Sequence, residues 1–361
     1  MTQSGYASLT GRPVQAISQI ASNDKVITYQ TARELEAVFP EFSAEEWLRL
    51  EAKYRLSLDN SGVDEAVVIK LRMELNRKAP VREMVRRGWL SPTKDVDQIK
   101  AEVCKFFGEK SLDKIKPPEY CARSSAELKS VHAAWVRRAV VLAETLKPKK
   151  KYSNKQLLAV LPSIKEALSV PERIAEIPHL LASAGVRVVF IEHLPKTRID
   201  GAAFWLGRGK AKGAIVLSLR FGRIDYFAFT LMHELAHILH EHEPSVDTEL
   251  TAAHQELLDY EVLANKWASE FLLPVDQLRR FLISTGNAPS KIAIERFAKE
   301  IGVHAGVVVG QLQHRGIVAY SSHRDLLVDI RDCLFKKRSD LVAAGVAAFD
   351  GFGSKDQEDV N

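Results

Sequence analysis

Residues 231–240 constrain the fold most, because their histidines recur at a helical spacing: Leu-Met-His-Glu-Leu-Ala-His-Ile-Leu-His. His233 and His237 are four residues apart, so a helix would place them on one face, one turn from each other. Two imidazoles in that arrangement can bind one Zn²⁺ at about 2.0–2.1 Å each. Glu234 lies next to the first histidine and can take a proton from a metal-bound water. The apolar residues between them predict a buried helix. The alternative is a buried helix whose histidines are incidental.

Two histidines leave zinc under-coordinated, so a third protein ligand is required. Residues 259–274 predict the next long helix, which ends at Pro274. On that helix one face carries Glu261, Ala264, Asn265 and Ala268. The two alanines allow close approach to another helix. We therefore predict Glu261 as the third ligand, with a fourth position open for water.

Three other histidines compete for the third position. His240 and His242 follow His237 too closely to converge with it easily, so we expect them to be exposed. His254 lies two turns before Glu261 and is the stronger rival. The other interpretation of Glu261 is an ordinary surface glutamate.

From about residue 185 to residue 322 the chain resembles the ImmA/IrrE family of metallopeptidases. The resemblance is carried by H-E-L-A-H at 233–237, E-x-x-A-N at 261–265 and A-S-E-F-L-L-P at 268–274, with further matches at 200–205, 217–225 and 297–313. It implies zinc binding by His233, His237 and Glu261, and catalysis by Glu234. It also implies a protein substrate such as a transcriptional repressor, although some relatives act as sensors with little peptidase activity.

The first sixty residues contain a turn followed by a helical pattern. Thr10-Gly11-Arg12 is the turn, and Pro13 suits the first position of the next helix. Residues 13–20 would turn Val14, Ile17 and Ile20 inward. This pattern resembles the helix-turn-helix of HigA-type antitoxins and other xenobiotic-response-element regulators, over residues 6–58. The resemblance makes 13–20 the recognition helix, and its candidate DNA contacts are Arg12, Gln15, Ser18 and Gln19.

Further helix starts, and one departure from that family, follow in the same region. Thr31 with Glu34 and Ser43 with Glu46 have the spacing of capping boxes, so a helix is expected to begin at each. Only five residues precede Tyr6, so we expect the usual first helix to be missing and residues 1–60 to form a truncated module. This stretch holds 6 Lys and Arg against 8 Asp and Glu. Phosphate contact supplies most non-specific DNA affinity, so the alternative is a helical interaction module without DNA binding.

Positive charge is concentrated in the middle of the chain. Residues 61–160 hold 22 Lys and Arg against 12 Asp and Glu. Helices are predicted at about 61–87, 95–107, 124–146 and 153–168, with capping boxes at Ser124 and Ser153 and a basic linker at 147–152. A solvated basic face is the simpler interpretation. A surface for nucleic acid or an acidic partner is the alternative.

The catalytic half has an α+β pattern. Apolar runs at 186–191, 201–206 and 214–219 predict a small antiparallel sheet beside the zinc helix. Asp225 is the expected N-cap of that helix. If 201–206 is an edge strand, it could dock an extended peptide; otherwise it packs inside the protein. Helices near 290–301 and 304–315 are expected to cover the active-site domain, and Tyr260 is the nearest candidate for oxyanion stabilisation.

The complete prediction is a mainly α chain with an α+β, zincin-like metallopeptidase domain and an N-terminal helix-turn-helix-like module. Its expected parts are a module at 1–60, a basic connecting region at 61–146, a linker at 147–152, the metallopeptidase domain at 153–325, and a C-terminal helix and disordered tail at 326–361. Three unpaired cysteines and no signal peptide or long apolar run predict a cytoplasmic protein without membrane contact.

The predicted function is zinc-dependent hydrolysis of a peptide bond in a partner regulator. The alternative is a non-catalytic, antitoxin-like transcriptional regulator that binds DNA, a toxin or both. The expected cofactor is Zn²⁺, the expected partners are a protein substrate or a toxin and a DNA operator, and a homodimer is left open.

Overall fold

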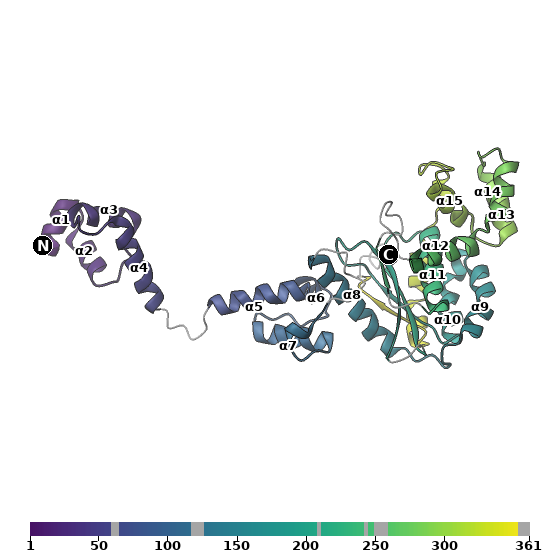
Figure 1. The fold of residues 1–361 in the computed structure, drawn as a ribbon, viewed down its shortest axis with the longest axis horizontal. Coiled ribbons are helices and arrows are strands. Elements are labelled where there is room, and N and C mark those ends of the chain that lie inside the picture. Colours follow the sequence, from purple (N-terminus) through teal and green to yellow (C-terminus); the bar gives the residue numbers. More distant parts are fainter. Residues whose placement is uncertain (59–64, 117–125, 208–210, 242–244, 249–258, 353–361) are drawn as a thin grey trace. The chain divides into compact units, whose positions relative to one another are not determined.

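The computed structural model describes residues 1–58, 65–116, 126–207, 211–241, 245–248 and 259–352. Their contacts divide the chain into two compact units, Met1–Lys70 and Leu71–Asn361, which we call unit 1 and unit 2. The chain is mostly helical and has one small sheet, as predicted (Figure 1). The finer domain boundaries expected at 60, 146, 152 and 325 stay predictions.

Four helices lie wholly within the described part of unit 1: α1 (Gln3–Thr10), α2 (Val14–Ala21), α3 (Tyr29–Val38) and α4 (Ala44–Leu58). Gly11 ends α1 at a φ of 67°, a left-handed conformation that glycine adopts without strain. A small core of Tyr6, Ala7 and Ile17 holds α1 to α2. Val14 was expected to face inward, but it is 48% exposed. It lies in the first turn of α2, one turn before Ile17, and so beyond this small core.

Helix capping in unit 1 agrees with one prediction and corrects another. The Ser43–Glu46 capping box is confirmed: the Ser43 N–H donates to Glu46 at 2.8 Å, and the Glu46 N–H donates to Ser43 Oγ at 3.2 Å. Thr31 does not cap α3. Thr28 does, because its hydroxyl accepts from the Thr31 N–H at 3.3 Å, while Thr31 itself is buried.

The sequence located the next helices approximately: α5 (Glu65–Lys78), whose first six residues belong to unit 1, and α6 (Val81–Arg86), α7 (Val96–Phe107), α8 (Ala126–Thr145) and α9 (Asn154–Ala167) in unit 2. The helix α10 (Ile177–Ser183) was not predicted. The predicted helix 61–87 is broken at Pro80, which lacks an N–H and disfavours helical geometry in the residue before it. Ser153 stands at the N-cap of α9 but makes no side-chain cap bond, so that capping box is not formed. Ser124 lies outside the described residues.

The sheet is mixed rather than antiparallel. Its strands are β1 (Arg187–Ile191), β2 (Ile199–Trp205), β3 (Gly213–Leu217), β4 (Ser245–Thr248) and β5 (Ala347–Asp350), in the order β4-β2-β3-β1-β5. β1 is parallel to β3 and β5, whereas β2 is antiparallel to β3 and β4. β2 therefore has a strand on each side. The prediction that 201–206 forms an edge for a docked peptide is wrong, because β4 already pairs with it.

The C-terminal segment also differs from its prediction. A C-terminal helix was expected here, and α16 (Arg331–Lys336) and α17 (Arg338–Ala343) lie in this region, but they lead into β5, a strand that was not predicted. A helical crossover of this kind allows a strand to return in parallel. Residues 353–361 lie outside the described part of the chain.

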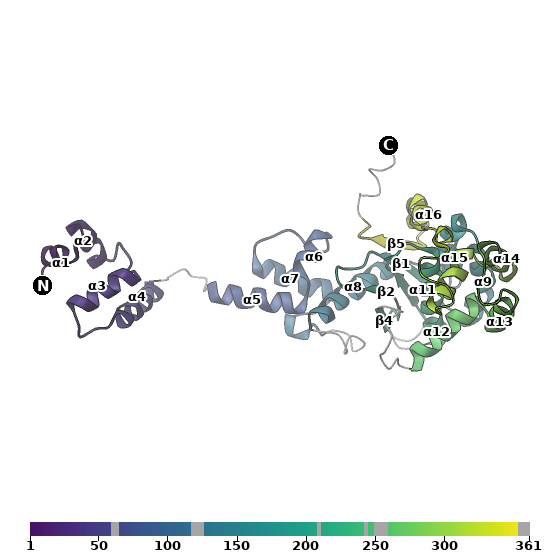
Figure 2. The ribbon, with the colours of Figure 1, turned by 90° about the horizontal axis from the view of Figure 1, so that it is seen from above.

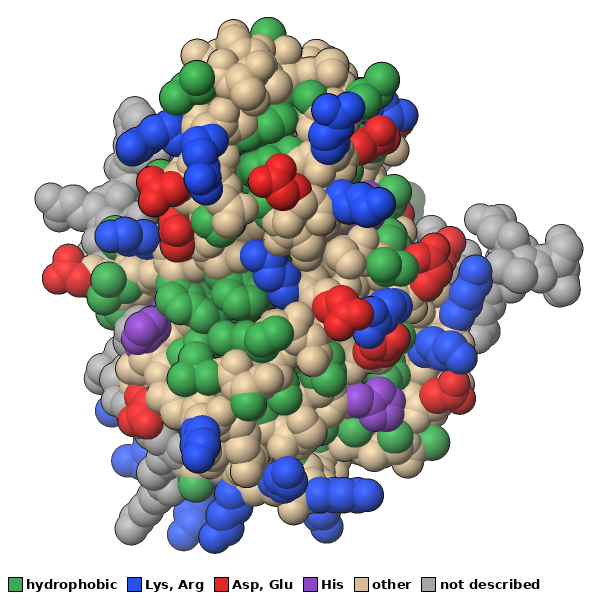
Figure 3. Space-filling model, turned by 90° about the vertical axis from the view of Figure 1, so that its right-hand side faces the viewer, with side chains coloured by type: hydrophobic (Ala, Val, Ile, Leu, Met, Phe, Trp, Pro, Cys, Tyr) green, Lys and Arg blue, Asp and Glu red, His purple; other side chains and the backbone are tan. Residues whose placement is uncertain are grey.

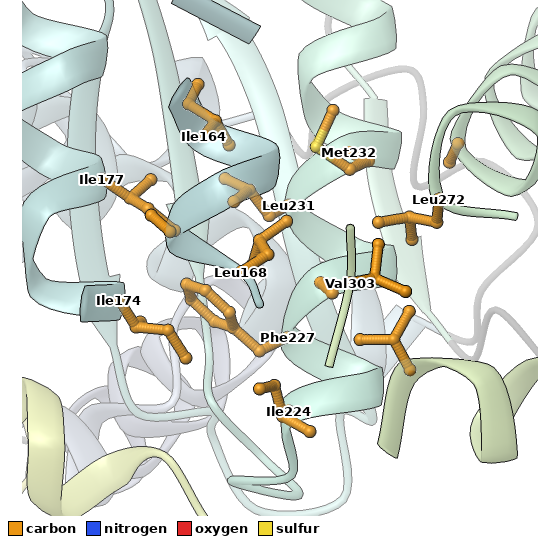
Figure 4. Close-up of a cluster of buried hydrophobic side chains, with 14 of the residues drawn as sticks. Ile164, Leu168, Ile174, Ile177, Ile224, Phe227, Leu231, Met232, Leu272 and Val303 are labelled. Carbon is orange, nitrogen blue, oxygen red and sulfur yellow. The ribbon is translucent and has the colours of Figure 1, made fainter. Parts of the chain in front are cut away.

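The zinc-signature helix α11 (Ile224–Leu239) lies against β2 and β3, and packs on α12 (Asp259–Leu272) and α15 (Ala305–His314) (Figure 2). Helices α13 (Val275–Ser284) and α14 (Lys291–Ile301) lie between α12 and α15 in the chain. The α14 and α15 predictions are confirmed to within a residue at each end. Figure 4 shows Ile224, Phe227 and Leu231 of α11 facing Leu168 and its neighbours, which fixes α11 in the core.

The outer surface of unit 2 carries some exposed apolar side chains. Figure 3 shows hydrophobic side chains gathered near the middle of one face, among basic and acidic groups. Among the described residues, no helix is both long and apolar enough to cross a lipid bilayer. Cys104 and Cys333 are free thiols, and Cys121 lies outside the described residues.

Candidate metal centre

The two histidines of the sequence motif face each other inside the protein. Nearly every residue of α11 is buried, because the helix is covered by the sheet, α12 and α15. His233 is 0% exposed and His237 is 2% exposed. Their Nε2 atoms lie 2.9 Å apart. The predicted one-turn spacing therefore brings both imidazoles to one point.

Glu261 reaches the same point from α12. Its Oε2 lies 3.2 Å from Nε2 of His233 and 3.6 Å from Nε2 of His237. Ala264 and Ala268 are completely buried on the same face, as expected of residues that let two helices approach closely. Among the residues that the structure describes, the three predicted ligands thus form a group of histidine and acidic side chains that could hold a metal ion.

The spacing of these three atoms fits a tetrahedral ion. Ligand atoms about 2.0–2.1 Å from a zinc ion in tetrahedral geometry lie about 3.3 Å from one another. The observed separations of 2.9, 3.2 and 3.6 Å lie on both sides of that value. Two imidazole lone pairs and a carboxylate oxygen, buried together, are also a donor set that zinc prefers.

Asn265 orients the first ligand. Its Oδ1 lies 3.0 Å from Nδ1 of His233, and an amide oxygen can only accept. Nδ1 of His233 must therefore donate, which leaves the Nε2 lone pair directed at the metal position. The sequence placed Asn265 on the correct face of α12 but did not assign this role. The sequence signal that could have indicated this role is the position of Asn265 one turn after Glu261, on the same face of α12.

The Glu234 side chain lies against the sheet, next to Gly201 of β2. Its side chain is completely buried and does not belong to the ligand group. It fits because β2 has no side chain at Gly201: a Cβ built there would lie 2.3 Å from Oε1 of Glu234. Sequence analysis missed Gly201. A glycine inside a strand is a general sign of close approach by another group, but the strand alone does not identify the group.

The electrostatics of Glu261 suit a ligand. Burial alone would raise its pKa, but hydrogen bonding with His233 and His237 outweighs burial and holds the pKa below its ordinary value. The carboxylate is therefore ionised at neutral pH, as metal binding requires.

The remaining candidates around the centre are placed as follows. The ring of Tyr260 packs edge-on against His237, with centroids 5.9 Å apart, so this hydroxyl-bearing side chain lies beside the metal centre. His240 is exposed at the end of α11, as expected. His242 and His254 lie outside the described residues.

Asp225 was expected to cap α11, and this prediction is wrong. Arg223 occupies the N-cap position, and Asp225 lies in the first turn of the helix. The Arg223 guanidinium donates to the Asp225 carboxylate at 2.7 and 3.0 Å. The negative charge of Asp225 still interacts favourably with the positive N-terminal end of the helix dipole. The start of α11 is set by the β-bridge between Arg223 and Asp329. Because Asp329 is distant in the sequence, the local pattern could not locate the first turn of the helix.

The candidate DNA contacts all lie in unit 1. Gln15, Ser18 and Gln19 are exposed on α2, as predicted from the helical pattern. Arg12 differs, because its guanidinium is paired with the Glu34 carboxylate of α3 at 2.9 Å. Any contact of Arg12 with phosphate or a base would compete with that ion pair.

Comparison with known proteins identifies one region. Residues 183–315 match the peptidase M78 family model, described as the IrrE N-terminal-like domain. This match includes α11, α12 and the three ligand candidates, and it supports a metallopeptidase domain in this part of the chain. A search of curated proteins finds no match to this chain.

Proposed function

We propose that the region 183–315 is a zinc-dependent peptidase domain that hydrolyses a peptide bond in a partner regulatory protein, such as a repressor. The observation that carries this proposal is the convergence of His233, His237 and Glu261, with the buried Glu234 beside them. The family match over the same residues supports it.

The proposed chemistry assigns one role to each group. Bound zinc would polarise the scissile carbonyl and lower the pKa of a water towards about 7. Glu234 takes a proton from the attacking water and passes it to the leaving amine nitrogen. Asn265 keeps His233 in the tautomer that ligation needs. Tyr260, beside His237, is the proposed donor to the carbonyl oxygen as negative charge develops there.

The test separates metal binding from catalysis. Purified protein should contain about one zinc per chain, and a His233→Ala, His237→Ala double variant should lose it. Glu234→Gln should keep the zinc and lose proteolysis, because an amide cannot accept the proton. Cleavage would be measured on a proteome-derived peptide library by mass spectrometry of new N-termini.

The matched control is Glu295→Gln, which changes an exposed glutamate on α14 in the same way. It should keep both zinc and cleavage. Full zinc in the double histidine variant would exclude this metal site. Equal cleavage by the Glu234→Gln protein would exclude Glu234 as the base.

A second proposal, from another class, is a regulator that binds an operator or a toxin and uses zinc structurally. The exposed polar face of α2, with Gln15, Ser18 and Gln19, favours it. Such a protein would need its zinc ligands but not Glu234. A Glu234→Gln variant that regulates normally in cells would therefore favour this second proposal over the first.

A further inference from the structure

Unit 1 contains a cavity of about 280 Å³ between its helices, which is partly open to solvent. This volume is close to the lower end of the range of about 300–1,000 Å³ typical of small-molecule sites. All four helices contribute to its wall, and most of the side chains are apolar or aromatic. The wall residues used below are Tyr6, Ile17, Ile20, Ala21, Phe39 and Trp47.

Aromatic rings form one side of this cavity. Tyr6 stacks on Phe39 with ring centroids 6.4 Å apart and planes inclined by 13°. The ring centroid of Trp47 also lies 6.4 Å from that of Phe39, with the ring planes inclined by 56°. A wall of this kind presents flat apolar surface, which suits a ligand with an aromatic ring.

Two hydrogen-bond donors in the wall are unsatisfied. The Tyr6 hydroxyl and the Trp47 indole N–H are buried, and neither has a hydrogen-bond partner among the residues that the structure describes. Tyr6 is only 6% exposed, so solvent does not readily replace the missing partner. Buried polar groups are normally hydrogen-bonded, and leaving one unpaired is costly. A ligand with an acceptor atom would satisfy such a donor after a small adjustment of the wall.

The charges around the cavity point to a neutral ligand. No residue in the wall has a charged side chain, and the charged α-amino group of Met1, which also lines the cavity, belongs to a residue that is 72% exposed, so water and salt screen it. The nearby Arg12 and Glu34 are paired with each other at 2.9 Å, so neither offers an uncompensated charge. A charged ligand would lose its hydration here without gaining a partner.

We propose that this cavity is a binding site for a neutral, mainly aromatic small molecule that carries a hydrogen-bond acceptor. The ligand packs on Phe39 and accepts a hydrogen bond from the Tyr6 hydroxyl. Because the wall is drawn from all four helices, an occupied cavity ties them together and stabilises unit 1. This site is separate from the proposed peptidase centre and does not depend on it.

The test uses the full-length protein and the probe 6-propionyl-2-(dimethylamino)naphthalene, a neutral aromatic ketone. Its emission shifts to shorter wavelength in apolar surroundings, so a saturable blue shift with one probe per chain is expected. Ile20→Trp fills the cavity and should weaken binding at least tenfold. Val14→Trp is the matched control, because it adds the same group to the same helix at an exposed position outside the wall. It should bind as the unmodified protein does.

A second pair of measurements tests the hydrogen bond. Tyr6→Phe should weaken binding of the ketone about two- to tenfold, the effect of losing one neutral hydrogen bond. It should leave binding of 2-(dimethylamino)naphthalene, which lacks the ketone, unchanged. If circular dichroism shows that the Ile20→Trp protein is unfolded, Ala21→Phe replaces it. Ala21 lines the cavity but is exposed, so a larger side chain can be accommodated there.

Three outcomes would overturn the proposal. The first is no saturable blue shift. The second is equal binding by the cavity-filling variant and its control. The third is a concentration-dependent dimer that is lost in the Ile20→Trp variant and is not affected by the probe. In that case the cavity would bind a second copy of the chain.

Discussion

At the scale of single residues, the candidate centre depends as much on a missing side chain as on those present. Gly201 lies in β2 where Glu234 of α11 approaches the sheet, and a Cβ there would lie 2.3 Å from the carboxylate and 2.9 Å from Thr230. The backbone of β2 is paired on both sides, so it cannot easily move away. The Glu234 side chain would have to move instead.

We therefore predict that Gly201→Ala displaces Glu234 without removing the ligands. The free energy of unfolding should fall by about 1–3 kcal/mol, the usual cost of overpacking. Zinc content should persist while proteolysis falls, which elemental analysis, urea unfolding and the cleavage assay would measure. Gly213→Ala in β3 is the control, because a Cβ there would lie 3.3–3.4 Å from its nearest neighbours, Trp205 and Ile238, about 1 Å farther than the Cβ at Gly201 would lie from Glu234. Unchanged cleavage by Gly201→Ala would contradict this explanation.

The ligand residues could be predicted from sequence because their geometry is local to two helices. The i, i+4 spacing of His233 and His237 and the alanine face that accompanies Glu261 follow from the helical repeat alone. The role of Gly201 could not, because it depends on which strand packs against α11. The cap at Asp225 was mistaken for a similar reason: the start of α11 is set by a bridge to Asp329, far along the chain.

At the scale of elements, β4 and β5 are the two strands of the described sheet that the sequence did not predict. Ala347–Asp350 is short, and short apolar runs do not reveal whether or how they pair. Its end is held by side chains from the basic helical region: the Trp89 indole N–H donates to Asp350 at 3.0 Å, and Arg138 pairs with the same carboxylate. These contacts join α8 and the segment after α6 to the sheet edge, although sequence suggested a separate connecting region.

We predict that Asp350→Ala destabilises unit 2 by about 1–3 kcal/mol, because it leaves the buried Trp89 donor without an acceptor. Hydrogen exchange of the β5 amides should also become faster, since the strand loses its anchor. Asp340→Ala on α17 is the matched control, because that carboxylate is 73% exposed. Equal unfolding midpoints for the two variants in urea would show that the network contributes nothing to stability.

At the scale of the whole molecule, three buried or half-buried histidines couple the stability of unit 2 to pH. Burial lowers the pKa of His132, His193 and His304 below the ordinary value of 6.5. Above pH 6.5 these groups are neutral in both the folded and the unfolded states. As the pH falls below that value, the unfolded chain takes up protons that the folded chain resists, so stability is lost.

We expect urea unfolding at pH 5.5 to have a lower midpoint than at pH 7.5, with a chelator present throughout so that zinc loss does not contribute. His132→Gln should reduce this difference, because His132 is 3% exposed and glutamine does not titrate. His179→Gln, at an exposed position on α10, should leave it unchanged. Equal differences between the unfolding midpoints at pH 5.5 and pH 7.5 in the two variants would contradict this prediction.

The charge distribution along the whole chain makes the last prediction, which concerns DNA. Unit 1 holds 7 Lys and Arg against 10 Asp and Glu, whereas residues 61–160 are strongly basic. Since phosphate contact dominates affinity, we predict that residues 1–70 alone bind the upstream region of this gene poorly, and that the full chain binds better but weakens steeply with salt. The full chain is compared, rather than a fragment that ends at residue 160 with the basic region. In such a fragment the indole N–H of Trp135 in α8 would lose its acceptor, the backbone carbonyl of Glu192.

Two sets of variants divide this predicted binding into its parts. Gln15→Ala with Gln19→Ala removes exposed polar groups of α2, so it should abolish sequence preference and leave non-specific binding. Changing the exposed Lys147, Lys149 and Lys150 to Gln should instead reduce the slope of log affinity against log salt by about 2–3, since each phosphate contact contributes about 0.9. Titration by fluorescence anisotropy at several salt concentrations measures both. Tight, sequence-specific binding by residues 1–70 alone would refute the charge argument, because an acidic unit would then read DNA without basic groups from the rest of the chain.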